Sequence, residues 1–164
     1  MGVAMSFDTR NGTRGARQPG HSRLERWGNA RMVERLGRRG DRRGRTVVLV
    51  TIGKKTGLER RTPVGWFPGE DGTGFIVASA SGAPRNPSWY YNIAAHPDRL
   101  AVERAGERTD VIAEQLHGAE RDAVWQRIMA VERGFARHER ITDRVIPVIR
   151  LTPRGGEPRL PVDD

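Results

Sequence analysis

The sequence predicts a mainly β protein folded as one small antiparallel barrel, and three observations support this. The chain has 164 residues, which suits a single domain with an adequate core. About five or six short β-type segments follow residue 45, and most of them are joined by tight turns. Helical patterns interrupt these segments in only two places, so the regular alternation that a doubly wound parallel sheet requires is missing.

The residues before the predicted barrel read as a basic arm. Residues 1–21 are rich in glycine, arginine and proline and offer little to bury, so no ordered structure is expected there. Residues 22–37 have the pattern of a basic amphipathic helix, which Ser22 and Glu25 begin as a capping box and Gly37 ends. Its apolar side chains, expected on one side, are Leu24, Trp27, Val33 and Leu36. Such a helix either packs on the body of the protein or lies on a membrane surface.

The predicted strands occupy much of the chain after the arm. They are, in order, 46–53, 61–68, 73–80, the two arms of 99–115, and 146–153. The first is almost wholly apolar, as a strand buried on both faces would be. The sequence GEDG at 69–72 predicts a hairpin, and a second hairpin is expected to turn at residues 105–106. Two helices are predicted between the strands, at 86–97 and 118–135.

Charge divides the chain in the same way as the elements do. The formal net charge is +9, and residues 1–45 carry 12 arginines against four carboxylates, so the remainder is almost neutral. We therefore expect a basic arm with one helix over 1–45, a barrel over 46–153 and a flexible tail over 154–164. A cationic arm suits an anionic surface such as lipid headgroups, and the alternative is a solvated tail.

Composition excludes several classes of function. The chain has no cysteine, so disulfides, thiolate metal sites and cysteine nucleophiles are excluded. No apolar run approaches the roughly 20 residues of a spanning helix, and the N-terminus lacks a signal-peptide core. No RRM, KH or helix-turn-helix pattern supports nucleic-acid binding. The expected location is the cytoplasm, peripheral at the inner face of the cell membrane if the arm binds lipid.

The loop GKKTGLERRTP, residues 53–63, holds both lysines of a chain with 29 basic residues. It is not a P-loop, because Val48 stands where the first glycine should be and Lys55 replaces the magnesium-binding hydroxyl. Gly53 and Gly57 allow a tight turn close to a ligand, and four cations lie within eight residues. The loop is a candidate anion site, and the alternative is a solvated hairpin turn.

The stretch SASGAPRNPSWYYN, residues 79–92, leaves a strand through small residues and enters a helix. Small residues let a flat ligand lie close to the backbone, and a helix start offers N–H groups that favour anions. The alternative is a plain turn with Trp89 in the core. Elsewhere the histidines show no metal-ligand spacing and no serine stands in a nucleophile elbow. An enzyme with such a sequence must take its chemistry from a cofactor.

Several motifs together resemble the deazaflavin-dependent nitroreductase family. The segments that carry the resemblance are GKKTGLERRTP, VASASGAPRNPSWYYNI, AAHPD and TDRVIPVIRL, in this order within residues 30–152. The resemblance implies a Greek-key-like split β-barrel of the FMN-binding type. It also implies that the cofactor is reduced coenzyme F420, a deazaflavin with a phosphodiester and a polyglutamate tail, with FMN as the alternative. The implied reaction is hydride transfer to an electron-poor conjugated acceptor: a quinone, an enone or enoate, or a nitroaromatic.

The resemblance also assigns roles to residues. Those matching the loop that binds the phosphate and tail are Lys54, Lys55, Thr56, Gly57, Arg60, Arg61, Thr62 and Pro63. Those matching the segment that lines or borders the deazaflavin are Ser79, Ala80, Ser81, Gly82, Ala83, Asn86, Trp89, Tyr90 and Asn92. Ser79 and His138 are the candidate catalytic residues, and no metal ligand is expected.

The chain departs from the family pattern before its T-x-R motif, where tyrosines are common. Phe135 and His138 stand at two of these positions. His138 is a candidate proton donor, since an unperturbed pKa of about 6.5 suits that task, and the alternative is a surface histidine at a helix end. The sequence SASG replaces the commoner S-N-G-G, and Asn86 replaces a frequent histidine, so substrate or ring contacts are expected to differ.

Two hypotheses of different classes follow. The first is an F420H(2)-dependent reductase acting on a small-molecule acceptor, with residues 1–45 bringing it to an anionic membrane surface. The second is a non-catalytic deazaflavin carrier or polyanion-binding module. The two differ in one observable, because a carrier binds the coenzyme without oxidising it.

Overall fold

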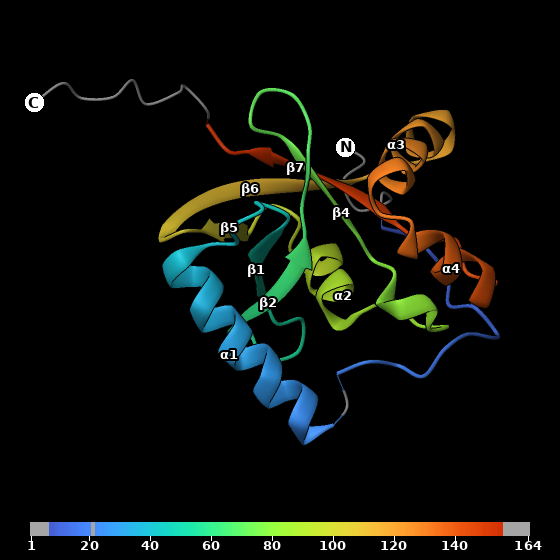
Figure 1. Cartoon of the computed structure of the whole chain (residues 1–164), viewed down its shortest axis with the longest axis horizontal. Helices are drawn as coiled ribbons and strands as arrows, with labels where there is room; N and C mark the ends of the chain where they lie inside the picture. The colour runs from blue at the N-terminus through green and yellow to red at the C-terminus, as the bar shows by residue number, and fades with distance from the viewer. Residues whose placement is uncertain (1–6, 21, 156–164) are drawn as a thin grey trace, which may run out of the picture.

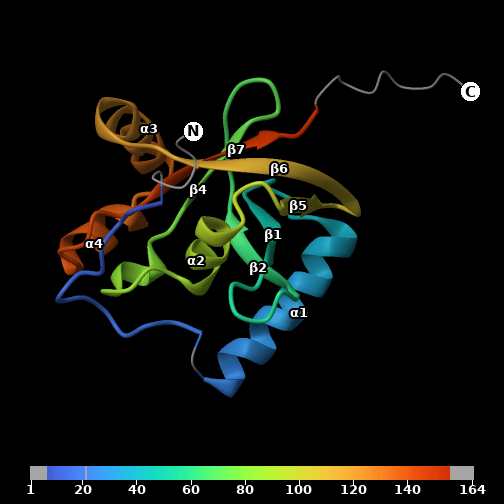
Figure 2. The same cartoon turned by 180° about the vertical axis from the view of Figure 1, so that it is seen from behind.

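The computed structural model describes residues 7–20 and 22–155, and Figure 1 shows how its elements are arranged. Seven strands form one antiparallel sheet in the order β2-β1-β5-β6-β7-β4-β3. Their bounds are β1 Thr46–Ile52, β2 Glu59–Gly65, β3 Phe67–Pro68, β4 Gly74–Val77, β5 Leu100–Arg104, β6 Glu107–Gln115 and β7 Val148–Pro153. The sheet curls into a half-barrel (Figures 1 and 2), which confirms the prediction of a mainly β, antiparallel split-barrel fold.

Strand β1 is buried on both faces, as its apolar sequence predicted. Val47 and Leu49 point into the main core, whereas Val48 and Val50 pack against helix α1, Arg23–Arg39. Successive side chains of a strand alternate between faces, so helices on both sides of the sheet cover this one strand. The main core also receives helix α2, Ser88–Ala95, on the opposite face from α1.

The predicted strand 61–68 is two strands in the structure. Strand β2 pairs with β1, whereas the short β3 pairs with β4 across the GEDG turn. The chain switches partner at Trp66, whose backbone N–H donates to the carbonyl of Arg45 and whose indole lies against Gly74. Gly74 has no side chain in the way of the ring, so the backbone of β4 approaches it closely.

The second predicted hairpin is confirmed as β5 and β6. Ala105 and Gly106 link the strands with φ values of 50° and 85°. Two positive φ angles in a two-residue loop give the turn whose twist matches that of the flanking strands.

Two helices follow β6 where one was predicted. Helix α3, Gly118–Val131, covers a second hydrophobic cluster with Val124, Trp125 and Ile128, and helix α4 runs from Gly134 to Ile141. The break falls at Glu132, which has φ −130° and ψ 84° and so leaves the helical region. Within the described residues, none of the helices is long and apolar enough to cross a membrane.

Helix α1 begins at the capping box that the sequence predicted. Ser22 Oγ accepts from Glu25 N–H, and Ser22 N–H donates to the Glu25 carboxylate, each over 3.0 Å. The helix continues past Gly37 and ends at Gly40, whose φ is 66°. Its predicted apolar side is buried only in the second half: Leu24 and Trp27 are 75% and 56% exposed. The sheet therefore supports the second half of α1, and the first half of the helix extends beyond the sheet.

Residues 7–20 form an N-terminal strap that runs along the turn before α2 and past α4 (Figures 1 and 2). Its backbone N–H groups at Gly12 and Ala16 donate to the carbonyls of Pro84 and Gly82, over 2.7 and 3.0 Å. The expectation of no ordered structure for 1–21 is wrong for the described part, because these contacts are long-range and invisible to composition. Residues 1–6 and most of the predicted tail, 156–164, lie outside the described residues.

Candidate functional site

One cavity of about 1080 Å³ brings together much of the predicted cofactor site. It lies between the first half of α1, the loop joining β1 to β2, strand β2 and helix α2. Predicted residues that line it are Lys54, Lys55, Thr56, Arg60, Arg61, Thr62, Pro63, Asn86, Trp89 and Asn92. Lining residues that the sequence did not single out come from the strap, α1, β2 and the start of α2, and include Asn11, Gln18, Arg26, Asn29, Arg85 and Tyr91.

The β1–β2 loop is held in a compact turn and attached to α2. Gly53 N–H donates to Leu58 O and Gly57 N–H to Gly53 O, both over 2.8 Å, and Gly57 has a φ of 69°. Asn92 fastens the loop, because its Oδ1 accepts from Lys54 N–H over 2.9 Å while its Nδ2 donates to Thr51 Oγ1. The lysines are thereby presented on a fixed backbone beside the cavity.

Five of the cations around the cavity have no acidic partner among the residues that the structure describes. No ion pair joins Arg26, Lys54, Lys55, Arg60 or Arg85 to a carboxylate anywhere in residues 7–20 and 22–155. Like charges gathered without counter-ions repel one another, and an anionic ligand removes that repulsion. The cavity is therefore suited to a ligand with several negative charges.

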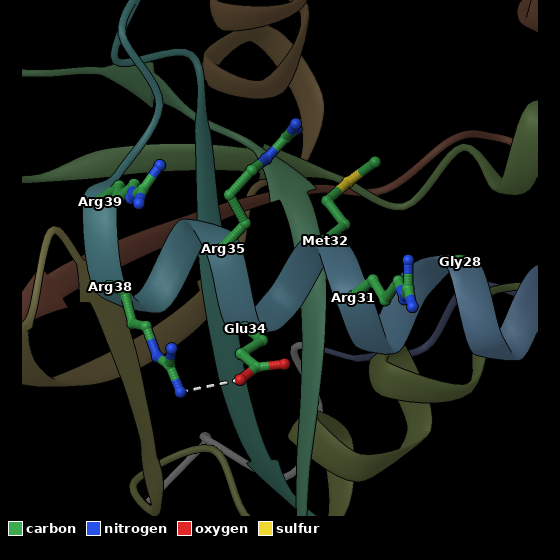
Figure 3. A pocket seen from close by; sticks show the side chains of 7 residues that line it. All are labelled: Gly28, Arg31, Met32, Glu34, Arg35, Arg38 and Arg39. Carbon is green, nitrogen blue, oxygen red and sulfur yellow. Dashed lines mark ion pairs between the residues drawn. The ribbon is translucent and has the colours of Figure 1, made fainter.

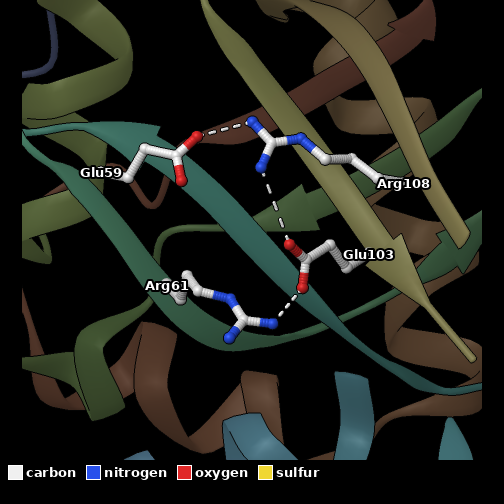
Figure 4. Close-up of polar contacts among 4 residues, drawn as sticks. All are labelled: Glu59, Arg61, Glu103 and Arg108. Atoms are coloured by element: carbon white, nitrogen blue, oxygen red, sulfur yellow. Dashed lines mark hydrogen bonds and ion pairs between the residues drawn. The ribbon is translucent and has the colours of Figure 1, made fainter. Parts of the chain in front are cut away.

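Arg61 is bound differently from Arg60, although both line the cavity. A chain of ion pairs runs from Glu59 through Arg108 and Glu103 to Arg61 across the outer face of the sheet (Figure 4). The hydrogen bond from Arg108, followed by its charge, lowers the pKa of Glu59. Arg61 is thus engaged by a carboxylate under α1, whereas the guanidinium of Arg60 donates to a hydroxyl, Thr56 Oγ1, over 3.4 Å and pairs with no carboxylate of the described residues.

Helix α2 turns its two neighbouring tyrosines in different directions. Tyr90, predicted to border the cofactor, is 2% exposed in the core, and its hydroxyl donates to Gln115 Oε1 over 2.6 Å. Burial raises the pKa of Tyr90. Tyr91 instead lines the cavity and donates to Asn11 of the strap over 2.9 Å. Adjacent helical residues point about 100° apart, so a motif containing both tyrosines does not reveal which one faces the ligand.

The predicted ring-lining residues form a strained turn beside the cavity instead of its wall. Ala80, Ser81 and Gly82 all have positive φ, at 45°, 57° and 79°, in the short 3-10 segment η2, Ala80–Gly82. The turn joins the cavity through Arg85 and Asn86. Ser79, Ala80, Ser81, Gly82, Ala83, Gly57 and Tyr90 are not among the cavity-lining residues in the described part of the chain.

Arg144 holds this turn through hydrogen bonds, and the sequence alone did not indicate this role. Its guanidinium donates to the carbonyls of Ala78, Ser79 and Ala83 and to Asn86 Oδ1, over 2.6 to 3.2 Å. The residue is 5% exposed, and burial lowers the pKa of Arg144. The sequence does contain a signal, the T-x-R motif at 142–144, but the motif only supports the family resemblance and does not indicate what its arginine contacts.

The two residues before Arg144 hold the strap. Asp143 accepts from Thr13 through both its N–H and its hydroxyl, and Thr142 Oγ1 donates to Arg14 O over 3.0 Å. Hydrogen bonds from the Thr13 side chain and the Arg14 N–H lower the pKa of Asp143 to about 2. One tripeptide therefore ties the strap and the turn together.

His138 lies on the α4 side of the turn. Its backbone carbonyl faces Gly82, where an added Cβ would stand 2.9 Å away, and its ring lies 5.7 Å from that of Phe135. Burial, followed by the charge of Arg137, lowers the pKa of His138. Ser79, the other candidate catalytic residue, is 8% exposed where the turn begins. The structure thus places the turn between His138 and the cationic cavity.

A second depression lies on the outer surface of α1 (Figure 3). Its lining residues are Gly28, Arg31, Met32, Glu34, Arg35, Arg38 and Arg39, and Glu34 pairs with Arg38 over 2.8 Å. One helix supplies the whole lining, so this surface is separate from the cavity between α1 and α2.

Comparisons with known proteins identify relatives of this chain. A family profile described as F420H(2)-dependent quinone reductase matches residues 21–153. The F420H(2)-dependent quinone reductase Rv1261c of Mycobacterium tuberculosis is 34% identical over 113 residues, which cover 66% of this chain and 74% of the relative. A solved F420-H2 dependent reductase, FDR-A, is 33% identical with a TM-score of 0.59, covering 66% of this chain and 94% of that one. A protein of Agrobacterium tumefaciens, Atu2129, shares the fold at 20% identity and a TM-score of 0.53, with coverage of 68% and 49%.

Proposed function

The chain belongs to the F420H(2)-dependent quinone reductase family, and on this premise we propose that it reduces a quinone-type acceptor by hydride transfer from coenzyme F420. The observation that carries the proposal is the cavity of about 1080 Å³ with five cations that pair with no carboxylate of residues 7–20 and 22–155. F420 is the cofactor of this oxidoreductase family. It carries a phosphodiester and several carboxylates, and these negative charges would pair with the cations that line the cavity.

The residues around the cavity fit the group. Lys54 and Lys55 stand on a backbone that Asn92 fixes, so their ammonium groups can meet phosphate or carboxylate without reordering the loop. Arg60 adds a guanidinium that no carboxylate in the described residues engages. Trp89 supplies an apolar surface in the same cavity.

The coenzyme, when bound, supplies a hydride. The residues of the chain orient the coenzyme and donate the proton that accompanies the hydride. Arg144 fixes the turn at 79–86 through its carbonyls, and we propose that this turn, beside the cavity, is the fixed edge on which the flat ring lies. The strap lies along this turn, and its Gly12 and Ala16 N–H groups donate to carbonyls of the turn.

A quinone takes up a proton together with the hydride, and we propose His138 as the donor with Ser79 beside the reacting groups. Two observations support an acceptor on the α4 side and an anionic tail in the cavity: Gly82 of the turn lies against the backbone of His138, and Lys54, Lys55 and Arg60 line the cavity. The lowered pKa makes His138 mostly neutral at pH 7, so proton donation is favoured toward acidic pH.

The test is a titration with oxidised F420 followed by the coenzyme's own fluorescence, with FMN as the control ligand. Micromolar or tighter binding of F420 alone is expected. Binding of FMN alone would move the protein to a flavin-dependent function, and binding of neither would withdraw the proposal. Oxidation of F420H(2) is then followed with quinones, enones and nitroaromatics. A protein that binds the coenzyme and oxidises it with none of them is a carrier.

We also propose that the outer surface of α1 contacts anionic lipid at the inner face of the cell membrane. Leu24, Trp27 and Met32 are exposed there among arginines, and Arg31 stacks on the Trp27 ring at 4.2 Å. Sedimentation with anionic vesicles tests this: Leu24→Ser with Trp27→Ser should weaken binding. Equal binding of the variant and the native chain would remove the membrane role.

A further inference from the structure

We propose that the first half of α1 is the far wall of the coenzyme site and that Arg26 on it binds carboxylates of the polyglutamate tail. This inference rests on the proposed function and extends it to a residue and a helix outside the family motifs quoted above. The arm would then select for tail length, in addition to any contact it makes with lipid.

Three separate segments supply the cavity's five cations that have no carboxylate partner in the described part of the chain. Lys54, Lys55 and Arg60 come from the β1–β2 loop and β2, Arg85 precedes α2, and Arg26 belongs to α1. Figures 1 and 2 both show the β1–β2 loop beside α1. A single phosphate can meet only a few cations at one point, whereas an elongated polyanion meets cations on several walls.

The face of α1 that meets the cavity is narrow and differs from its outer face. Arg26, Asn29 and Ala30 line the cavity, at the three- and four-residue spacing that places side chains on one side of a helix. Arg31 lines the depression on the other surface (Figure 3). Two arginines five residues apart on one helix therefore face different surroundings.

The position of this half-helix is not explained by core packing. Its apolar side chains Leu24 and Trp27 are exposed, and the buried contacts of α1 come from Val33 and Leu36. The capping box nevertheless keeps the first turn helical. In the capping box the carboxylate of Glu25, the residue before Arg26, accepts a hydrogen bond from Ser22 N–H.

The experiment compares three ligands: F420 with a long glutamate tail, F420 with a single glutamate, and the deazaflavin riboside without phosphate or tail. Each is titrated by fluorescence into the native chain, Arg26→Gln, and the matched control Arg31→Gln. Both arginines are exposed on α1, so neither substitution should change the melting temperature.

For Arg26→Gln we expect about five-fold weaker binding of the long-tailed coenzyme, the size of one partly exposed charge pair. The riboside should bind unchanged, and Arg31→Gln should match the native chain for every ligand. Equal affinities of Arg26→Gln and Arg31→Gln for the long-tailed coenzyme would overturn the inference while leaving the proposed function intact. Failure of the native chain to bind any F420 form would instead refute the proposed function, and this inference with it.

Discussion

Replacing Arg144 with methionine should unfold the turn at 79–86 and destabilise the whole domain. The substitution removes four hydrogen bonds and leaves the carbonyls of Ala78, Ser79 and Ala83 and the amide oxygen of Asn86 without their donor. Arg144 is 5% exposed, so water cannot replace the lost donors without opening the structure. A buried acceptor left without its donor costs about 1–3 kcal/mol, so four of them, partly offset by the removal of a buried charge, should cost about 3–5 kcal/mol of unfolding free energy.

Two opposing effects determine the change in unfolding free energy for Arg144→Met. Hydrogen bonds from a charged donor contribute about 1.5–3 kcal/mol each, but the guanidinium itself is costly to bury, as the lowered pKa of Arg144 shows. We expect the stranded acceptors to dominate, because the turn they belong to also holds the positive φ angles of Ala80 and Ser81. A loss of about 3–5 kcal/mol corresponds to a melting temperature roughly 10 °C lower in a chain of this size.

The assay is urea unfolding followed by circular dichroism, with thermal melting as a second measurement. Arg127→Met on the exposed surface of α3 is the matched control and should change stability by less than about 0.5 kcal/mol. Arg144→Lys should fall between the two, since an ammonium keeps the charge but cannot reach every acceptor. If Arg144→Met were as stable as the native chain, the guanidinium would be a dispensable buried charge and the reasoning would be refuted.

Three further predictions follow from the site. Arg60→Gln should weaken F420 binding about five-fold without lowering stability, whereas Arg61→Gln should chiefly lower stability, because Arg61 belongs to the ion-pair chain of Figure 4. Similar effects of both on binding, measured by fluorescence, would contradict this. Asp143→Asn should release the strap and speed tryptic cleavage after Arg14, read by mass spectrometry. Acid should release the strap in the same way. The pKa of Asp143 in the folded state lies below its ordinary value of 3.8, so the contact with Thr13 is complete above about pH 4 and is lost as the pH falls toward 2. If His138 donates the proton, turnover of the native enzyme should fall as pH rises through a pKa below 6.5, and His138→Gln should abolish that step. An unaltered pH profile in the variant would remove the role.

Local patterns predicted the elements that depend on neighbouring residues. The capping box at Ser22 and Glu25 starts α1, and the turn at Ala105–Gly106 joins β5 to β6, because both depend on residues a few positions apart. The glycine-bounded loop with its lysines was recognisable for the same reason and does line the cavity. The pairing of Arg61 with Glu103 could not be read from the loop, because it joins residues 42 positions apart.

Residues whose role depends on distant partners could not be read from the sequence. The strap looked structureless because its composition offers little to bury, yet it is held through Thr13 by Asp143, 130 positions away. Tyr90 and Tyr91 are adjacent in the motif, and only packing decides that the first enters the core while the second faces the cavity. His138 was recognised as an unusual residue, but its place across the turn from the cations depends on how α4 packs against Gly82.

The sequence by itself determined the class of fold, the cationic loop and the resemblance to deazaflavin-dependent reductases, because these follow from periodicity, composition and short spacing. Only the tertiary structure decided which cations find no carboxylate partner among the described residues, that Arg144 supports the turn, and that the first half of α1 lines the cavity with Arg26. Such facts depend on which side chains meet across long separations in the chain. Burial and pairing are properties of those meetings, so no local pattern of residues encodes them.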